Sequence, residues 1–419
     1  MIQIDREQID RASFSTKINE FNKFEPFRHP EGKAYAICSH DALGLILSVI
    51  YLRGQGASVL LLHPDTPFET AKHMSTQAGC SYLQYGRWDD VCTLDGRAPF
   101  SEPGLLQFSS GTTGRPKLIF RSWTEVAAEI QAYNSVLKPE PEEISLIMVP
   151  VSHSFGLITG VLAALERGAE AVVVQNKNPK FQLRMIGATE RSILYAVPYF
   201  YHLLLTLGKD TLHFHKLISS GAALTGSLLK QLQSRSRQVW QQYGCTEIGC
   251  ISLGEQPLSL WDAGYALPHL QVSIQPAAHP EYGEIVVEKP GGVRIQTRDL
   301  GSLTDDGRLR LYGRLDDLIN VGGLKVIPME VESVLERMPG IKETVVFRTH
   351  HPVYGEAAKA LIVADQEVSG AAVKAWCLTH LPSYKIPNFI ELVPKLPRLP
   401  SGKISRKLLE EQERSKHGQ

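Results

Sequence analysis

Short apolar strands alternate with helical stretches between residues 34 and 198, and this alternation most constrains how the chain can fold. The strand-like runs are AYAICS (34–39), SVLLLHP (58–64), SLIMVP (145–150), EAVVVQ (170–175) and ILYAVP (193–198). Stretches of helical length and pattern lie between them, at 42–56, 68–79 and 157–168. Apolar strands separated by helices indicate right-handed βαβ units whose parallel sheet is covered on both faces. We therefore predict an α/β fold with a large parallel portion.

The pattern changes beyond residue 280. GEIVVEKP, RIQTRD and GRLRLYGR are short strands joined by Gly/Asp turns, which is typical of an antiparallel or barrel-like part. A helix is expected to begin near Pro328, with acidic residues in its first turn, and a strand and further α/β alternation follow. We predict a large domain over 1–315 and a small mobile α+β domain over 316–419. The polar last ten residues are expected to be frayed.

Composition excludes several classes of protein. The 419 residues contain 44 Lys and Arg against 44 Asp and Glu, which argues against a general nucleic-acid or polybasic membrane surface. The six cysteines form no C-x-x-C pair, so we expect neither a disulfide framework nor a zinc site, and we expect a cytoplasmic location. The amino terminus is too charged for a signal peptide, and the apolar runs are too short for a membrane span. The oligomeric state is not indicated.

Residues 108–120, FSSGTTGRPKLIF, are a hydroxyl- and glycine-rich run. Between a strand and a helix, such a run presents several N–H and O–H donors to an anion, which favours a phosphate-binding loop. It is not a Walker A loop, because Pro116 precedes Lys117 and Leu118 follows it, so no hydroxyl is placed to hold magnesium. A flexible Ser/Thr/Gly turn is the ordinary alternative.

The chain resembles the adenylate-forming (AMP-binding) superfamily of acyl-CoA synthetases, peptide-synthetase adenylation domains and luciferases. Ser109 to Lys117 matches that family's SSGTTG-x-PK loop residue for residue. Further segments similar to family motifs follow in order, from about residue 35 to the end of the chain: PVSHSFG (150–156), SGAAL (220–224), QYGCTEIG (242–249), RDLGSLTDDGRLRLYGRLDDLI (298–319), VGGLKVIPMEVE (321–332) and LPSGKISRKLL (399–409).

The resemblance implies a two-step reaction. A carboxylate attacks the α-phosphate of ATP and releases pyrophosphate, and a thiol then attacks the acyl-adenylate. The loop would wrap the β- and γ-phosphates, Tyr243 would lie against the adenine, and Asp299 beside Arg314 would hold the ribose. The implied nucleotide-binding residues are Ser109, Ser110, Gly111, Thr112, Thr113, Gly114, Lys117, Gly221, Ala222, Ala223, Tyr243, Gly244, Asp299 and Arg314.

The same resemblance implies catalytic roles for Lys403, Thr246 and His153. Lys403 would reach the α-phosphate and the acyl carboxylate from the small domain, and Thr246 would donate to the α-phosphate. Glu247 would bind the Mg²⁺ that bridges phosphate oxygens, because magnesium suits one carboxylate plus phosphates. His153 would lie near the acyl site.

The resemblance also implies that the small domain rotates between the two half-reactions. Asp316 matches the family's hinge position. The doubled Gly322-Gly323 would line the thiol tunnel, where it allows close approach of a pantetheine arm. An ordinary β-turn is the alternative for these glycines.

Taken singly, these residues have ordinary structural explanations. A glutamate such as Glu247 is commonly a solvated surface charge, and Tyr243 a packing residue. Asp299 could be a turn residue, and His153 a hydrogen-bonded structural histidine. It is the joint order and spacing of the motifs that favour the functional interpretation.

The chain departs from the family pattern in several places. The loop normally continues with a small residue and ends in Ser-His, whereas Leu118 and Trp123 stand at those positions here. The region before the loop is shorter than usual. Since the chain ends soon after Lys403, a free-standing ligase is expected. Amino-acid-activating relatives place an aspartate just after the position of His153; Ser154 stands there instead, which favours an aryl or aliphatic acid.

The motifs are compatible with three functions. The main expectation is a carboxylate–CoA ligase that uses ATP, Mg²⁺ and coenzyme A. The alternative is an enzyme that loads the acyl group onto the phosphopantetheine of a separate carrier protein. A catalytically silent nucleotide-binding protein is the third, and the intact Lys403, Glu247 and Asp299 argue against it.

Overall fold

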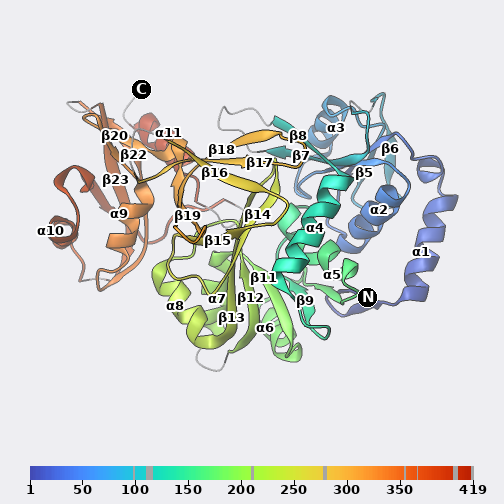
Figure 1. Ribbon diagram of the computed structural model, residues 1–419, viewed down its shortest axis with the longest axis horizontal. Helices are drawn as coiled ribbons and strands as arrows, with labels where there is room; N and C mark the ends of the chain where they lie inside the picture. Colours follow the sequence, from blue (N-terminus) through green and yellow to red (C-terminus); the bar gives the residue numbers. More distant parts are fainter. Residues whose placement is uncertain are drawn as a thin grey trace.

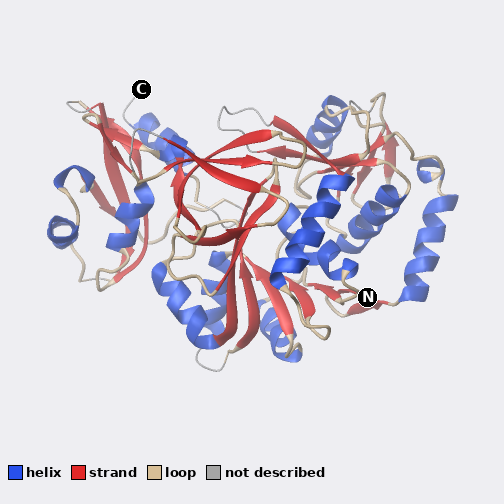
Figure 2. Ribbon diagram, viewed as in Figure 1, coloured by secondary structure: helices blue, strands red, loops and turns tan. Residues whose placement is uncertain are grey.

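The computed structural model describes residues 1–97, 100–109, 117–208, 212–276, 281–352, 355–365, 367–399 and 404–416. Two large sheets with helices between and outside them are followed by a smaller carboxyl-terminal unit (Figure 1, Figure 2). This mixed α/β architecture confirms the predicted fold class. Within the described ranges, no helix is long and apolar enough to cross a membrane.

The first sheet has six strands in the order β6-β5-β3-β4-β7-β8. Its four central strands are parallel, and β6 and β8 run antiparallel to their neighbours. The strands are β3 (Ala34–Cys38), β4 (Ser58–Leu61), β5 (Tyr82–Tyr85), β6 (Val91–Thr93), β7 (Gly104–Ser109) and β8 (Lys117–Ser122). The helices α2 (Ala42–Gly54) and α3 (Phe68–Gln77) join them as expected.

The second sheet has thirteen strands in the order β16-β17-β18-β19-β15-β14-β13-β12-β11-β9-β10-β1-β2. Strands β1, β9, β10, β11, β12 and β13 are parallel, and from β14 onward the pairing is antiparallel. The parallel part comprises β1 (Ile2–Ile4), β9 (Ile144–Ile147), β10 (Ala171–Val173), β11 (Ser192–Ala196), β12 (Phe214–Ser219) and β13 (Ser236–Cys245), with β2 (Glu7–Ile9) antiparallel at the edge. The antiparallel part comprises β14 (Gly249–Glu255), β15 (Asp262–Ala266), β16 (Gln271–Pro276), β17 (Gly283–Glu288), β18 (Arg294–Leu303) and β19 (Leu309–Arg314).

The main hydrophobic core lies between the two sheets. It joins strands of both sheets to α2, α4 (Trp123–Leu137), the π-helical segment η2 (Phe155–Leu162) and α5 (Ala163–Glu166). The single helix expected over 157–168 is therefore a π-helical segment followed by a short α-helix. Helices α6 (Pro179–Ala188), α7 (Pro198–Gly208) and α8 (Gly226–Arg235) cover the other face of the large sheet. Helix α1 (Arg11–Lys23) packs against α2.

The carboxyl-terminal unit has its own sheet and core. Strands β21 (Leu324–Val326), β20 (Ile319–Val321), β23 (Gly355–Ala364) and β22 (Ile341–His351) pair in that order, and β24 (Phe389–Leu392) pairs with β23. Helices α9 (Pro328–Leu335) and α10 (Gly370–His380) share a core on one face, and α11 (Arg406–Lys416) packs on β22. The expectation of a frayed end is wrong for 410–416, because α11 buries Leu409 and Glu413. The boundary at 315/316 stays a prediction.

Candidate active site

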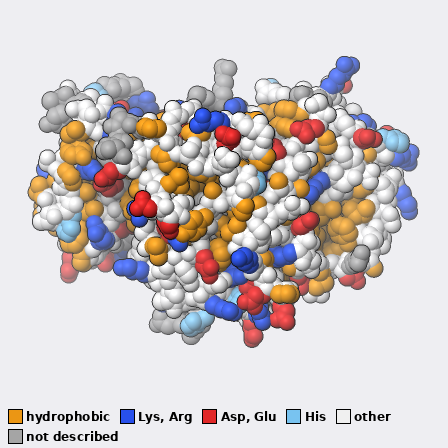
Figure 3. Space-filling model, viewed as in Figure 1, with side chains coloured by type: hydrophobic (Ala, Val, Ile, Leu, Met, Phe, Trp, Pro, Cys, Tyr) orange, Lys and Arg blue, Asp and Glu red, His pale blue; other side chains and the backbone are white. Residues whose placement is uncertain are grey.

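The parallel strands of the large sheet end along one edge, and several predicted site residues follow those ends. His153 comes after β9, Gly221 after β12, and Thr246 and Glu247 after β13. Ligands of open α/β sheets bind outside the carboxyl ends of the strands, which makes this edge the candidate active site. On the face drawn in Figure 3, basic and acidic side chains are interspersed rather than gathered by sign.

Tyr243, Asp299 and Arg314 meet in one hydrogen-bonded group. Asp299 lies in β18 opposite Arg314 in β19. Tyr243 Oη donates to Asp299 Oδ2 over 2.7 Å, and Arg314 donates to Asp299 Oδ1 over 3.1 Å. Burial raises the pKa of both Asp299 and Tyr243, so the phenol stays protonated and keeps donating. The structure thus brings together three residues that the sequence places far apart.

The turn between β13 and β14 carries Thr246 and Glu247. It begins at Cys245, whose pKa is raised to about 12 by burial, with the carboxyls of Glu247 and Asp299 acting in the same direction. Cys245 is therefore a protonated thiol at neutral pH and does not act as a thiolate nucleophile. Glu247 also acts to raise the pKa of Asp299, so the two carboxyls are electrostatically coupled.

The two ends of the predicted phosphate loop pair with each other. Ser109 ends β7 opposite Lys117, which begins β8, and Ser109 Oγ donates to the Lys117 carbonyl over 3.5 Å. The remaining predicted loop residues, Ser110, Gly111, Thr112, Thr113 and Gly114, lie outside the described residues. The antiparallel pair β7-β8 holds the entry and the exit of this loop side by side.

His153 is exposed at the edge of the site, with its ring centroid 6.0 Å from that of His63. The next residue, Ser154, donates to Gln107 Oε1 over 2.5 Å, which ties the end of β9 to β7. Phe155 lies against Tyr195 with ring centroids 5.8 Å apart. Tyr195 and Gln107 are buried, whereas Ser154 and Phe155 are partly exposed near the region where an acyl group is expected.

The predicted strip Gly221, Ala222 and Ala223 begins two residues after the end of β12, and Gly221 has φ of +86°. That backbone conformation strongly favours glycine. Gly244 lies in β13, where an added Cβ would meet the Gly249 carbonyl oxygen at 2.1 Å. Both glycines are thus required by the backbone, whatever their role toward a nucleotide.

Asp316 lies in the short segment η4 (Leu315–Asp317), between the two predicted domains. It forms an ion pair with Arg298, whose guanidinium holds the pKa of the Asp316 carboxyl below its ordinary value. Gly322 and Gly323 form the exposed turn between β20 and β21, with φ of +57° and +93°. Lys403 lies outside the described residues.

Sequence reasoning missed two residues next to Asp299, one that supports Asp299 and one that pairs with Asp316. Thr297 Oγ1 accepts a hydrogen bond from the Asp299 N–H over 3.1 Å and donates to the Ile285 carbonyl over 2.9 Å. Arg298, the partner of Asp316, joins the hinge position to β18. Their adjacency to Asp299 in the segment QTRDLG is the signal that could have singled them out.

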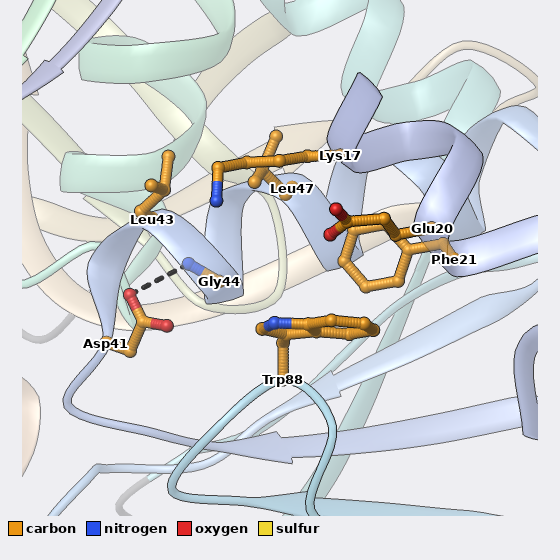
Figure 4. A pocket seen from close by; sticks show the side chains of 8 residues that line it. All are labelled: Lys17, Glu20, Phe21, Asp41, Leu43, Gly44, Leu47 and Trp88. Carbon is orange, nitrogen blue, oxygen red and sulfur yellow. Dashed lines mark hydrogen bonds between the residues drawn. The ribbon is translucent and has the colours of Figure 1, made fainter. Parts of the chain in front are cut away.

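Two other features of the described residues lie away from this edge. Glu140, Glu143 and His215 bring oxygen and nitrogen atoms within 4.8 Å of one another, but Lys216 Nζ already neutralises Glu143 at 2.9 Å. A hollow between α1 and α2 is shown in Figure 4, with the α2 N-cap at its base. Its lining includes none of the predicted site residues: Lys17, Glu20, Phe21, Asp41, Leu43, Gly44, Leu47 and Trp88.

The residues present fit a magnesium nucleotide. The carboxylate of Asp299 can accept hydrogen bonds from ribose hydroxyls, and Thr246 offers a donor to a phosphate. Glu247 supplies a single carboxylate, and magnesium usually takes one or two carboxylates together with substrate phosphates. The two half-reactions of an adenylating ligase therefore have a chemically suitable donor set at this edge.

Comparison with known proteins identifies the family. The model of the AMP-binding enzyme family matches residues 64–295, and that of the AMP-binding enzyme C-terminal domain matches 330–403. The chain is 42% identical over 411 residues to a 3,4-dihydroxybenzoate–[aryl-carrier protein] ligase of Bacillus anthracis, covering 98% of both chains. It is 26% identical to a 2-succinylbenzoate–CoA ligase of Lactococcus lactis, covering 96% of both.

Solved structures share the fold. ATP-bound MatB from Rhodopseudomonas palustris matches with a TM-score of 0.86 at 20% identity, over 98% of this chain and 95% of that one. The AMP complex of o-succinylbenzoate coenzyme A synthetase from Bacillus subtilis matches with a TM-score of 0.81 at 22% identity, over 97% and 94%. On the two family models and the 42% identical relative together, this chain belongs to the AMP-binding enzyme family and is an AMP-forming ligase.

Proposed function

We propose that this ligase activates a hydroxylated benzoate as its adenylate and transfers the aryl group to the phosphopantetheine thiol of a carrier protein. The observation that carries the proposal is the 42% identity, over 98% of both chains, to the aryl-carrier protein ligase. Coenzyme A, the main expectation from the sequence, is not favoured over this acceptor.

The described residues support an aromatic acid. The site edge carries the half-buried Phe155, whose ring lies beside that of the fully buried Tyr195 and offers an aromatic surface against which a benzoate ring can pack. The hydrogen-bonded Ser154 and Gln107 lie next to it and offer partners to ring hydroxyls. Ser154 stands where amino-acid-activating relatives place an aspartate, so an α-ammonium group has no carboxylate partner at that position.

In the first step, a benzoate oxygen attacks the α-phosphorus of ATP and the bond to the pyrophosphate oxygen breaks. Asp299 and Arg314 would hold the ribose, and Thr246 would donate to the α-phosphate. Bound at Glu247, Mg²⁺ would supply positive charge to the phosphate oxygens. In the second step, the thiol sulfur attacks the acyl carbon and AMP leaves.

The proposal predicts carboxylate-dependent ATP–pyrophosphate exchange with benzoates. Exchange would be measured with 3,4-dihydroxybenzoate, 2,3-dihydroxybenzoate, 4-hydroxybenzoate, octanoate, palmitate and phenylalanine. Benzoates should be preferred by at least about 100-fold, and Lys403→Ala should lower exchange by about 100-fold or more, since it removes a charge placed on the transferring group. A preference for palmitate or phenylalanine would contradict the proposed substrate class.

The acceptor is tested separately, with the preferred acid. Thioester formation would be followed by mass spectrometry with coenzyme A, pantetheine or a phosphopantetheinylated aryl-carrier protein as the thiol. The carrier should react at least about 10-fold faster than coenzyme A at equal concentration, because protein–protein contacts add to those of the arm. Equal or faster reaction with coenzyme A would restore the CoA-ligase interpretation.

A further inference from the structure

A buried ion pair contacts Gly249 and Cys250, the two residues that begin β14 just after the turn with Thr246 and Glu247. Arg121, in β8, pairs with Glu129, in the second turn of α4, and their side chains are 2% and 1% exposed. The Arg121 Nε and Nη1 atoms meet no hydrogen-bond acceptor among the described residues, so the Glu129 carboxylate is the charge that compensates this guanidinium there. The cost of desolvating such a pair offsets much of its attraction, so its contribution to stability does not by itself explain it. Its contact with β14 next to the candidate active site suggests a role in positioning.

The Glu129 carboxylate joins three elements. One oxygen is held by Arg121, and the other, Oε1, accepts the backbone N–H of Cys250 over 2.7 Å. Gly249 packs onto the pair so closely that an added Cβ would lie 2.3 Å from Glu129 Oε2 and 2.5 Å from Arg121 Nη1. Helix α4 contacts both β8 and β14 (Figure 1). The pair therefore fixes the β14 end of the turn against the strand that begins with Lys117.

We propose that the buried Arg121–Glu129 pair is a positioning element for adenylation, which holds the Thr246–Glu247 turn in register with Lys117 at the start of β8. The inference rests on the proposed function, because it takes Thr246 and Glu247 to act on the phosphates and their magnesium. Strand β8 carries both Lys117 and Arg121, and the Glu129 carboxylate joins Arg121 to the backbone of Cys250, just after the turn. A small displacement of reacting groups is enough to cost a large factor in rate.

The chain offers a matched control pair. Lys216 Nζ lies 2.9 Å from Glu143 Oε1, and both residues are as deeply buried as Arg121 and Glu129. Glu143 precedes β9 and Lys216 lies near the start of β12, so this second pair is at the amino ends of the parallel strands. Replacing it tests the general cost of losing a buried ion pair without touching the edge that carries Thr246.

The test compares Arg121→Met/Glu129→Gln with Lys216→Met/Glu143→Gln. Neutral residues of similar volume often replace a buried ion pair without loss of stability, so both variants are expected to fold. Three quantities would be measured: the AMP Kd without metal, the ATP Kd with and without Mg²⁺, and the Mg²⁺ concentration for half-maximal pyrophosphate exchange. Thermal unfolding of each variant would be recorded alongside.

The Arg121/Glu129 variant should bind AMP within about threefold of the wild type, since Tyr243 and Asp299 are untouched. Its half-saturating Mg²⁺ concentration should rise about 10-fold, its exchange rate should fall about 10- to 100-fold, and the gain in ATP affinity from Mg²⁺ should shrink by a similar factor. The control variant should change none of these. Arg121→Lys, which keeps the charge, should recover part of the loss.

Equal effects of the two double variants, or losses that simply follow thermal stability, would overturn the inference. If the Arg121/Glu129 variant fails to fold, Arg121→Lys decides: unchanged Mg²⁺ dependence overturns the inference, and a raised Mg²⁺ requirement supports it. A wild type without exchange on any benzoate contradicts the proposed function instead. The effect of Mg²⁺ on the ATP Kd can be measured without a carboxylic acid substrate, so it still tests the inference in that case. If Mg²⁺ does not change the ATP Kd of the wild type, the inference is contradicted.

Discussion

Asp299 shows how one buried carboxyl can be prepared for a ribose. Its side chain is 14% exposed, and both of its oxygens already accept hydrogen bonds, from Tyr243 and Arg314. Burial raises its pKa while these two donors act in the opposite direction. The ionised form is therefore held in a fixed orientation, and its remaining lone pairs are available to two ribose hydroxyls.

Asp299→Asn should weaken adenosine binding about 10- to 100-fold, because hydrogen bonds to a charged acceptor are lost. Wild-type affinity should also fall as the pH is lowered, and the fall should begin at a higher pH than for an exposed aspartate, since protonation of a raised-pKa carboxyl removes an acceptor. Adenosine is the ligand of choice because it carries no titrating phosphate. Calorimetry across a pH series checks both points, and an equal pH dependence in Asp299→Asn would refute the second.

Helix α4 explains one departure from the family pattern. Trp123, at the position where the family usually has histidine, is the first residue of α4 and is 8% exposed. Its Nε1 donates to the Ala57 carbonyl over 2.8 Å, and Ser122 with Glu125 forms a capping box around it. The tryptophan thus ties the helix after the phosphate loop to the start of β4, and its position is structural.

Trp123→Phe should destabilise the protein by about 1 to 2 kcal/mol, because the buried Ala57 carbonyl loses its donor while most of the packing remains. Pyrophosphate exchange at 20 °C should stay within about twofold of the wild type. Denaturant unfolding and exchange assays on the same preparation check this. A large loss of exchange without a loss of stability would place Trp123 in the active site after all.

The sequence pattern predicts some elements and misses others for identifiable reasons. The apolar runs that form β3, β4, β9, β10 and β11 are buried on both faces, with only Ile144 of β9 partly exposed, so their continuous apolar pattern is a strong signal. Strands β1 and β2 have three residues each, and β1 pairs with β10 far along the chain, which local patterning cannot show. Helix α11 buries Glu413 through an ion pair with Lys359, so its buried face does not look apolar.

The sequence predicts those residues of the candidate site that lie in family motifs occurring in the expected order along the chain. Tyr243, Asp299 and Arg314 were named from their motifs, and their contact arises from sheet pairing and curvature that bring β13 near β18. The Arg121–Glu129 pair could not be predicted, because an arginine in KLIFRS shows its partner only once α4 is packed. The roles of the named residues stay predictions.

At the scale of the whole molecule, specific contacts join the carboxyl-terminal unit to the rest. Arg398 lies over the ring of Tyr199 at 4.7 Å, and the backbone N–H of Gly226, the first residue of α8, acts on the Glu336 carboxyl to lower its pKa. Figure 1 shows α8 and α9 facing each other across this boundary. If the unit rotates between half-reactions, as the family resemblance implies, these contacts must break in each cycle.

Glu336 makes this boundary sensitive to pH. Burial, with Glu332 nearby, raises the pKa of Glu336 from 4.5 to about 7 in the folded protein. The folded state then binds more protons than the unfolded state between these values, so the stabilising contribution is complete below pH 4.5 and is lost as the pH rises through 7. At pH 8, Glu336→Gln should be more stable than the wild type by at most about 3 kcal/mol, and the difference should shrink toward pH 5.

Thermal unfolding from pH 5 to 8.5 measures this difference in stability, with substitution of the exposed Glu190 by Gln as the matched control. Parallel curves for wild type and Glu336→Gln would show that the boundary does not titrate, and docking of the unit would then be governed by contacts such as Arg398 on Tyr199.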